Sequence, residues 1–180
     1  EEINVGIKNR IMPIINYMIA TKPLNQELQK NIIPSDYCVS DTNFDLNYYR
    51  LSADKRMIFG GGVSYSLNHS EKLAKKTEKR MLKVFPELKD EKAEYIWGGY
   101  VGITVNRVPD IGQSSERIFY AHGFSGHGVA LTGIAGKIIA NSVYSGEKGA
   151  LETFKKIKHR NFPGGRLFKM PLLVIISTLQ

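Results

Sequence analysis

The sequence has one cysteine and no long apolar run. With Cys38 alone among 180 residues, the chain can build neither a disulfide framework nor a cysteine-based zinc or iron–sulfur site, and it fits a reducing compartment. The longest apolar run, residues 171–179, falls well short of the roughly 20 residues that span a bilayer. The acidic start at Glu1 and Glu2 lacks the basic and apolar regions of a signal peptide. We therefore expect a cytoplasmic chain without a transmembrane segment.

Familiar catalytic and nucleotide-binding signatures are also missing. No GxGxxG occurs, and Gly60–Gly62 is not followed by the Gly-Lys-Ser/Thr of a phosphate loop; the three glycines instead indicate a tight turn or a close backbone approach. No histidine and carboxylates stand at metal-ligand spacing, so no metal site is expected. Asp110 and Glu116 are candidate acids, but spacing pairs neither with a histidine. The sequence therefore identifies no catalytic residue.

The excess of positive charge, formally +8, lies mainly in two short stretches. Basic domains often bind nucleic acid or membrane surfaces. The first stretch coincides with an amphipathic helical stripe, so we interpret its lysines as a solvated helix face. No aromatic platform or helix-turn-helix pattern favours nucleic-acid binding, and no nucleic-acid partner is expected. The two stretches consist of Lys72, Lys75, Lys76, Lys79, Arg80 and Lys83, and of Lys155, Lys156, Lys158, His159 and Arg160.

The order of strand and helix patterns predicts an α+β fold, a mostly antiparallel sheet with few helices. A buried strand is expected over residues 11–20, and two strand-like segments, 47–51 and 56–60, predict a hairpin. Apolar spacings of three and four predict a helix over 71–85 with Ser70 as its N-cap. The apolar stripe of this helix comprises Leu73, Thr77, Met81, Val84 and Phe85. The other expected elements are a short helix over 24–31, strands over 93–105 and 117–121, the latter buried, and a helix over 128–144 capped by Gly146.

The most informative segment, residues 118–136, predicts a strand, a glycine-rich turn and the start of a helix packed through small residues. A helix N-terminus offers unpaired N–H groups and a partial positive charge. Together with the turn glycines, it suits an anion or a group that becomes negative during a reaction. A role of these glycines in turn geometry and helix packing alone is equally compatible with the spacing. For His127, we favour a helix-start residue that bonds backbone over a proton-transfer role.

Several segments together match the pattern of a known family. They are residues 19–24, 48–51, 59–62, 97–99, 107–112, 119–129 and 162–166. They resemble the FAD-dependent oxidoreductases of the D-amino-acid oxidase superfamily, which includes glycine oxidases, sarcosine oxidases and D-amino-acid dehydrogenases. Within it, the chain is most similar to the gamma-glutamylputrescine oxidoreductase branch. The resemblance covers nearly the whole chain from about residue 10, and the turn with its small-residue helix is the most specific part.

The resemblance implies an FAD-binding domain joined to a substrate domain that is built on a large antiparallel sheet. Residues 1–105 would belong to the substrate domain, 106–146 would supply the last strand and helix of the FAD-binding part, and 147–180 would form a C-terminal tail. The family transfers a hydride from an amine-bearing carbon to flavin, and the helix N-terminus would face the end of the ring that is anionic when reduced. The residues implied to contact FAD are Gly123, Phe124, Ser125, Gly126, His127, Gly128 and Val129.

One departure from the family lies on the substrate side. In relatives that act on α-amino acids, an Arg-Pro that follows a Trp-x-Gly-x unit binds the substrate carboxylate, and no Arg-Pro follows Trp97–Tyr100 here. Sarcosine oxidases carry a lysine where this chain has Ala130. The resemblance therefore implies a small amine rather than an α-amino acid as substrate. Residues in the other motifs are substrate-side candidates, although core packing and surface pairing are the favoured alternative. These candidates are Tyr49, Arg50 and Trp97.

The second departure is the absence of the half that holds GxGxxG and the acidic residue for the ribose. The expected partner is therefore an N-terminal FAD-binding half or a companion chain, and the chain alone is not expected to be active. The first hypothesis is the C-terminal part of a flavin-dependent amine oxidoreductase, which a companion chain with GxGxxG would favour. The second is a non-catalytic remnant or interaction module that forms a homodimer, which stable oligomers without flavin would favour. The weakest hypothesis is a basic nucleic-acid or membrane-surface protein, which steeply salt-dependent DNA binding would favour.

Overall fold

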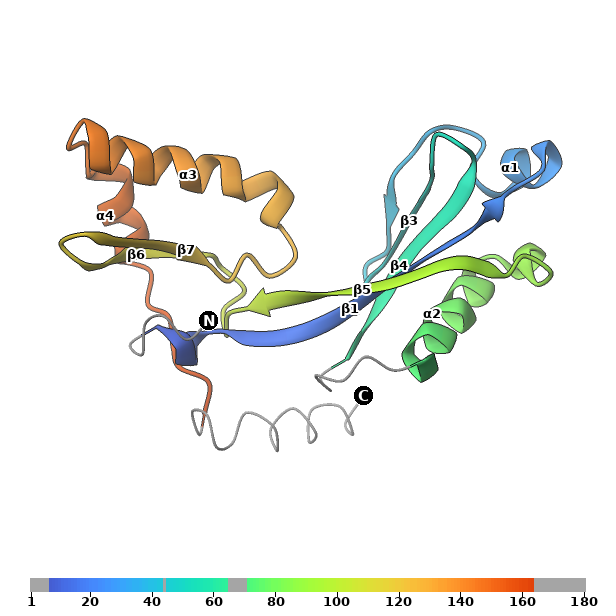
Figure 1. Ribbon diagram of the computed structural model, residues 1–180, viewed down its shortest axis with the longest axis horizontal. Coiled ribbons are helices and arrows are strands. Elements are labelled where there is room, and N and C mark those ends of the chain that lie inside the picture. Colours follow the sequence, from blue (N-terminus) through green and yellow to red (C-terminus); the bar gives the residue numbers. More distant parts are fainter. Residues whose placement is uncertain (1–6, 44, 65–70, 164–180) are drawn as a thin grey trace. The chain divides into compact units, whose positions relative to one another are not determined.

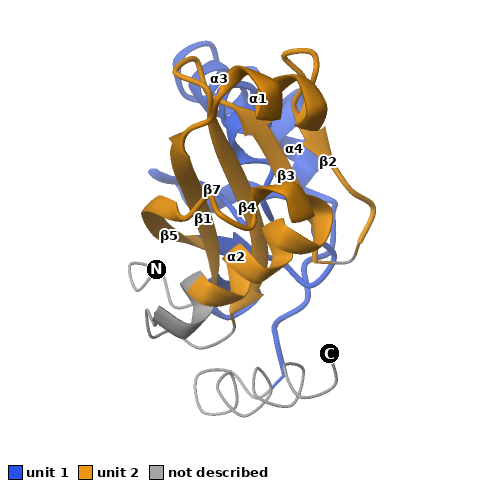
Figure 2. Cartoon of the chain, turned by 90° about the vertical axis from the view of Figure 1, so that its right-hand side faces the viewer, with its two compact units in different colours: residues 1–14, 101–180 blue, residues 15–100 orange. Residues whose placement is uncertain are grey.

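The computed structural model describes residues 7–43, 45–64 and 71–163, without the side chains of 71–74. The chain divides into two compact units (Figure 2). Unit 2 comprises Ile15–Tyr100, and unit 1 comprises Glu1–Ile14 together with Val101–Gln180. The division therefore groups the start of the chain with its C-terminal part, and each unit has its own apolar core.

Unit 2 is built on a five-stranded sheet with the strand order β2-β3-β4-β1-β5 (Figure 1). The pairs β2–β3, β3–β4 and β1–β4 are antiparallel, so the predicted α+β fold and the predicted hairpin are confirmed. β5 lies at one edge of the sheet, beside β1 only. The strands are β1 (Met12–Pro23), β2 (Val39–Ser40), β3 (Asn47–Leu51), β4 (Arg56–Ser64) and β5 (Ala93–Ile103).

Two α-helices of unit 2 form close to the positions expected from the sequence. α1 (Gln26–Ile32) begins at Asn25, whose side chain accepts a hydrogen bond from the Leu28 N–H at 2.9 Å. α2 (Glu71–Val84) covers one face of the sheet, and the short 3-10 helix η2 (Pro86–Leu88) follows it. The expected cap Ser70 and the Leu73 side chain lie outside the described part of the chain.

The buried stripe of α2 is narrower than the sequence predicts. Thr77 and Met81 are buried, and Phe85 follows them into the core, whereas Val84 is 37% exposed. Arg80, expected on the solvated lysine face, instead forms an ion pair with Asp45 at 2.6 Å. The helix therefore holds the sheet both by apolar packing and by this pair.

The three glycines of β4 mark a close approach rather than a tight turn. β4 continues through them to Ser64, and a Cβ on Gly60 would collide with the ring of Tyr48 on the neighbouring strand. On the opposite face of β4, Met57 and Phe59 are fully buried in the core beneath α2. The missing side chain at position 60 therefore makes room for the Tyr48 ring.

Unit 1 consists of a two-stranded hairpin covered by two α-helices. β6 (Asp110–Ser115) and β7 (Ile118–His122) pair antiparallel, and α3 (Gly128–Tyr144) and α4 (Gly149–Lys155) pack against them. A 3-10 turn, η1 (Lys8–Arg10), belongs to the same unit. The shared core consists of Ile111, Ala135 and Leu151, surrounded by Phe119, Ala121, Phe124, Ile138, Ile139 and Phe154.

Unit 1 confirms some predictions and corrects others. The helix over 128–144 has the predicted bounds, and Gly146 follows it with a positive φ of 69° that suits a helix C-terminus. The strand predicted as buried is only half-buried, and Ile118 is 46% exposed, because the hairpin buries one face alone. β6 and α4 were not predicted from the sequence.

Membrane spans and metal clusters are not seen in the described ranges. No helix there has both the length and the apolar character to cross a bilayer. No group of three or more histidine, cysteine or acidic side chains there is arranged to hold a metal ion.

Candidate functional site

The glycine-rich turn between β7 and α3 has a shape that requires glycine at its first position. Gly123 has a φ of 69°, which side chains disfavour. A Cβ there would collide with the Thr104 side chain and lie 2.7 Å from Cδ1 of Ile11. The chain therefore leaves β7 sharply and in direct contact with the segment that follows β5.

Hydrogen bonds fix the middle of the turn. Ser125 is not a glycine, yet it has a φ of 53°. Its N–H donates to the carbonyl of Gly102 at 3.1 Å, and its hydroxyl donates to the carbonyl of Gly123 at 3.0 Å. Gly126 also has a positive φ, of 96°, but a Cβ there would have no heavy atom within 4 Å. The turn is thus anchored on one side and open on the other.

The turn leads into an α3 N-terminus with no side-chain cap. His127 occupies the N-cap position, and its side chain makes no capping hydrogen bond, although its carbonyl accepts from the Leu131 N–H at 3.1 Å. The first turn of α3 carries no acidic residue, and Val129 is fully exposed. The first N–H groups of a helix lack intrahelical acceptors and carry partial positive charge. This end of α3 is therefore suited to an anion that approaches from the open side.

Residues 123–129 lie in different environments, some packed against the core and some exposed to solvent. The side chain of Phe124 packs into the apolar core of unit 1, and at Gly128 a Cβ would meet neighbours only at ordinary van der Waals distance. Gly126, His127 and Val129 are exposed. The exposed members form the part of the turn that a ligand can reach.

The three predicted substrate-side residues lie in different settings within unit 2. The Tyr49 ring stacks on Phe59 at 5.5 Å and meets Phe85 edge-on at 4.9 Å, so it is part of the core. Arg50 forms an exposed ion pair with Asp36 at 3.0 Å. Trp97, on β5, is 45% exposed. Of these three side chains, Trp97 alone combines an apolar ring with exposure, and the packing of Tyr49 and Arg50 agrees with the alternatives favoured from the sequence.

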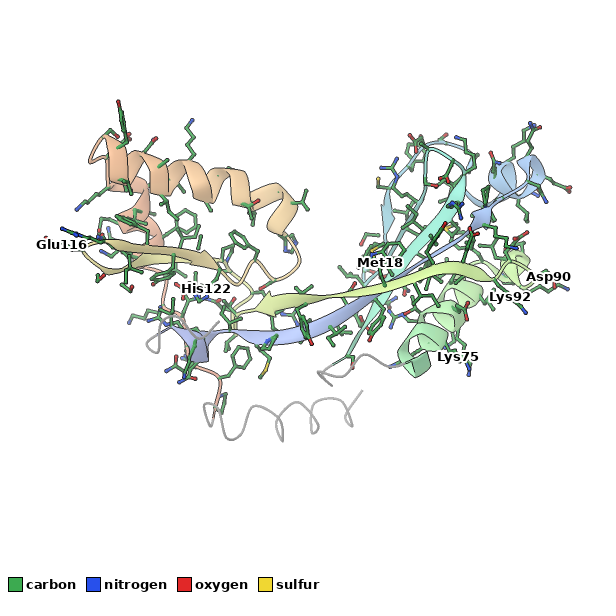
Figure 3. All side chains as sticks on the ribbon, viewed as in Figure 1. Met18, Lys75, Asp90, Lys92, Glu116 and His122 are labelled. Atoms are coloured by element: carbon green, nitrogen blue, oxygen red, sulfur yellow. The ribbon has the colours of Figure 1, made fainter. Side chains whose placement is uncertain are left out.

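Tyr48 and Asn16 form a polar pair that the sequence analysis missed. The Tyr48 hydroxyl donates to Oδ1 of Asn16, and the ring crosses Gly60 on the sheet face opposite Tyr49. Burial raises the pKa of the Tyr48 hydroxyl, which therefore stays a neutral donor at physiological pH. In the strand register, Gly60 of β4 pairs with Met18 of β1 (Figure 3) on one side and with Tyr48 of β3 on the other. The pair therefore lies on the sheet face away from α2.

Asp110 corrects a second expectation, namely that no histidine accompanies the candidate acids. Asp110 and His122 are cross-strand partners in the β6–β7 hairpin, and the ring Nε2 lies 3.1 Å from the carboxylate. Arg10 donates to the same carboxylate oxygen at 3.1 Å. Glu116 lies at the exposed tip of the hairpin (Figure 3). The pairing was missed because antiparallel register, rather than sequence spacing, brings the two residues together.

A family comparison identifies the class of protein. The model of a family described as FAD dependent oxidoreductase, DAO, matches residues 2–142. The chain therefore belongs to the DAO family of FAD-dependent oxidoreductases, and the resemblance found in the sequence is confirmed.

Individual relatives narrow the comparison. Gamma-glutamylputrescine oxidoreductase of Escherichia coli is 37% identical over 171 residues, which are 95% of this chain and 40% of the relative. A probable oxidoreductase, OrdL, of Haemophilus influenzae is 42% identical over 170 residues, covering 94% of this chain and 38% of the relative. The chain thus spans about two fifths of the length of these relatives.

Solved structures of low sequence identity share the fold. Glycine oxidase from Geobacillus kaustophilus matches with a TM-score of 0.62 at 18% identity, over 78% of this chain and 37% of that one. L-Proline dehydrogenase from P. horikoshii matches with a TM-score of 0.60 at 23% identity, over 78% and 38%. The chain therefore shares its α+β architecture with parts of this oxidase and this dehydrogenase.

Proposed function

We propose that this chain is the C-terminal part of a flavin-dependent amine oxidoreductase and is inactive without the rest of that enzyme. The observation that carries the proposal is the uncapped N-terminus of α3 behind a turn with two positive-φ glycines. When bound, FAD would accept a hydride from a carbon that bears an amine. The chain's own contribution is to hold one end of the flavin ring and to provide part of the substrate side.

The turn fits one end of FAD and leaves the other without a site. The positive helix end and the absence of acids in its first turn suit an anionic ring edge. Gly126, with open space around its Cβ position, lets a flat ring approach the backbone closely. The chain carries no GxGxxG for the pyrophosphate. FAD binding therefore needs a second polypeptide segment.

The substrate side of the proposal rests on residues of the sheet in unit 2. Trp97 offers an exposed aromatic surface. The Tyr48 hydroxyl and Asn16 offer a polar pair in the same unit. No Arg-Pro directly follows the Trp97–Tyr100 segment to pair with a substrate carboxylate, since Val101 and Gly102 stand there. This composition favours a small amine over an α-amino acid.

Exposed apolar surface supports a partner segment. The outer face of α3 carries exposed Val129, Ile134 and Tyr144, and a Cβ at Gly133 or Gly136 would meet open space. Small residues on a helix let another backbone approach closely, and exposed apolar patches mark interaction surfaces. The relatives are much longer than this chain. We assign this face to the remaining N-terminal part of the enzyme or to a companion chain that replaces it.

A chimera tests the proposal directly. This chain would replace the matching segment of the Escherichia coli gamma-glutamylputrescine oxidoreductase, and FAD content and amine-dependent flavin reduction would be measured. We expect the chimera to retain FAD and to oxidise amines, while the 180-residue chain alone shows no saturable quenching of flavin fluorescence. Tight FAD binding by the isolated chain would overturn the claim that the site is divided.

Substitution of the turn tests the flavin contact. Gly126→Leu in the chimera would place a side chain where the ring approaches, and we expect FAD affinity to fall at least tenfold. Gly146→Leu is the matched control, because Gly146 also has a positive φ, of 69°, and open space around its Cβ position, but follows the C-terminal end of α3. Equal affinity in both variants would sink the contact assignment.

A dimerising module without catalysis is the second candidate, and the same exposed face of α3 favours it. Light scattering of the purified chain distinguishes the two. A concentration-independent dimer that persists when the N-terminal part is added supports the module. A monomer, or a dimer that the N-terminal part dissociates, supports the enzyme.

A further inference from the structure

Three segments of unit 1 meet at one buried carboxylate. The Asp110 side chain on β6 is 4% exposed, and its Oδ2 is bonded by Arg10 of η1 and by His122 of β7, both at 3.1 Å. Arg10 also donates to the Tyr120 hydroxyl at 3.4 Å. The third segment follows α4, where His159 places Nε2 at 3.9 Å from Oδ1 of Asp110.

His159 is the anomaly of this cluster. Its side chain is 3% exposed, and neither Nδ1 nor Nε2 has a hydrogen-bond partner among the described residues. It belongs to the second basic stretch of the sequence, yet its side chain is buried while its neighbours Lys158 and Arg160 are exposed. Burial of an imidazole without hydrogen bonds disfavours its charged form.

A backbone hydrogen bond joins the segment around His159 to the start of the chain. The Phe162 N–H donates to the carbonyl of Asn9 at 2.9 Å, three residues beyond the histidine. The Phe162 amide is therefore a local reporter of whether residues 156–163 are docked on η1 and the hairpin.

We propose that His159 is the pH-sensitive latch of unit 1, which docks residues 156–163 when neutral and releases them when it takes up a proton. The device lies within unit 1 and is independent of the proposed function. The groups that face His159 are Asp110 from β6, Arg10 from η1 and His122 from β7.

The direction of the pH dependence follows from linkage. Burial lowers the pKa of His159 below its ordinary 6.5, and the electrostatic effects of Arg10 and His122 act in the same direction, while Asp110 opposes them. The released segment regains the ordinary pKa, so the released state binds more protons. The segment is therefore fully docked above about pH 6.5. Below this pH, the equilibrium constant for docking falls by up to tenfold per pH unit, until the pH reaches the lowered pKa of docked His159.

Hydrogen exchange of the 180-residue chain tests the latch. We expect the protection factor of the Phe162 amide, corrected for the intrinsic rate, to fall by up to tenfold per pH unit between pH 6.5 and 5. The Met57 amide, which donates to the Thr21 hydroxyl at 3.0 Å within unit 2, is the internal control and keeps its protection. His159→Phe, a buried ring that cannot titrate, should abolish the pH dependence. His127→Phe removes an exposed histidine and should retain it.

A direct titration keeps the proposal falsifiable if His159→Phe fails to fold. The imidazole signals of the unmodified chain, followed by NMR, should give His159 a midpoint below 6.5 that matches the loss of Phe162 protection. Protection of Phe162 that does not vary between pH 7 and 5 would overturn the latch. So would a His159 midpoint at or above 6.5, or an unaltered pH dependence in His159→Phe.

Discussion

At the scale of single residues, two glycines of one turn have positive φ for different reasons. Gly123 is confined by the Thr104 and Ile11 side chains, whereas Gly126 faces open space. Only the backbone conformation therefore requires glycine at 126, while both conformation and packing require it at 123.

The two alanine variants separate these contributions. Gly126→Ala should lower the free energy of unfolding by about 1–2 kcal/mol, the cost of a left-handed residue with a side chain. Gly123→Ala should cost about 1–3 kcal/mol more, because the added Cβ overpacks the contact with Thr104. Urea unfolding of both variants measures the difference. Equal destabilisation would show that the neighbours of Gly123 give way freely.

Protonation of Asp110 should lower the stability of the chain at a more acidic pH than the range in which His159 titrates. Although burial raises the pKa of Asp110, the hydrogen bonds from His122 and Arg10 outweigh it and hold the pKa below the usual 3.8. Its folded pKa is depressed, so its contribution to stability is complete above about pH 4 and is lost as the pH falls through the folded value.

Asp110→Asn should therefore destabilise the chain by about 1.5–3 kcal/mol at neutral pH, the range for hydrogen bonds to charged groups. The difference from the unmodified chain should shrink below pH 4. Urea unfolding between pH 2.5 and 7 measures both. Asp36→Asn, which breaks the exposed pair with Arg50, is the control and should change little. A constant difference across the whole range would contradict the assignment.

The limits of sequence prediction are clearest at Tyr48 and Tyr49. Alternation along a strand says that adjacent side chains face opposite sides, but not which side is the core. Tyr49 turns toward Phe59, and Tyr48 toward Asn16. Likewise, Asp110 and His122 meet through strand register and His159 through the return of the chain, which spacing along the sequence does not reveal.

At the scale of elements, the long periodic segments were predictable, whereas β6 and α4 were not. The helices over 71–85 and 128–144 carry periodic apolar patterns and form with nearly the expected bounds. β6, with the sequence DIGQSS, contains one β-branched residue and forms because β7 pairs with it. The seven residues of α4 make about two turns, too few for a clear period, and the core of unit 1 stabilises them.

The buried face of α2 makes a prediction at this scale. Met81 is 1% exposed and Val84 is 37% exposed. Met81→Ala should therefore cost about 2–5 kcal/mol, as for large cavities in a core, while Val84→Ala should cost less than about 1 kcal/mol. Thermal or urea unfolding of the two variants checks the packing. Comparable losses would show that the helix is rotated from the described orientation.

At the scale of the whole molecule, each unit leaves apolar surface exposed. In unit 2, β5 is an edge strand with exposed Tyr95, Trp97 and Tyr100. In unit 1, the outer face of α3 is apolar along most of its length. Edge strands are normally protected by charges, proline or a covering element. The residues from Tyr95 to Val105 contain neither a charge nor a proline.

Trp97, the single tryptophan of the chain, provides a signal for binding of the proposed partner. In the isolated chain its ring is 45% exposed, so we expect emission at long wavelength and efficient quenching by acrylamide. Addition of the N-terminal part of the enzyme should shift the emission to shorter wavelength and reduce quenching. Unchanged fluorescence in a complex that light scattering confirms would place the partner away from β5.

The edge strand β5, which carries no charge from Tyr95 onward, also affects how long the protein survives in a cell. Chaperones and proteases act on chains that display unpaired strand edges and apolar side chains. We expect the half-life of this chain to rise when its partner is co-expressed and to fall when it is made alone. The cellular concentration of the chain would then depend on the amount of its partner, because an exposed β5 edge would mark unassembled chains for degradation.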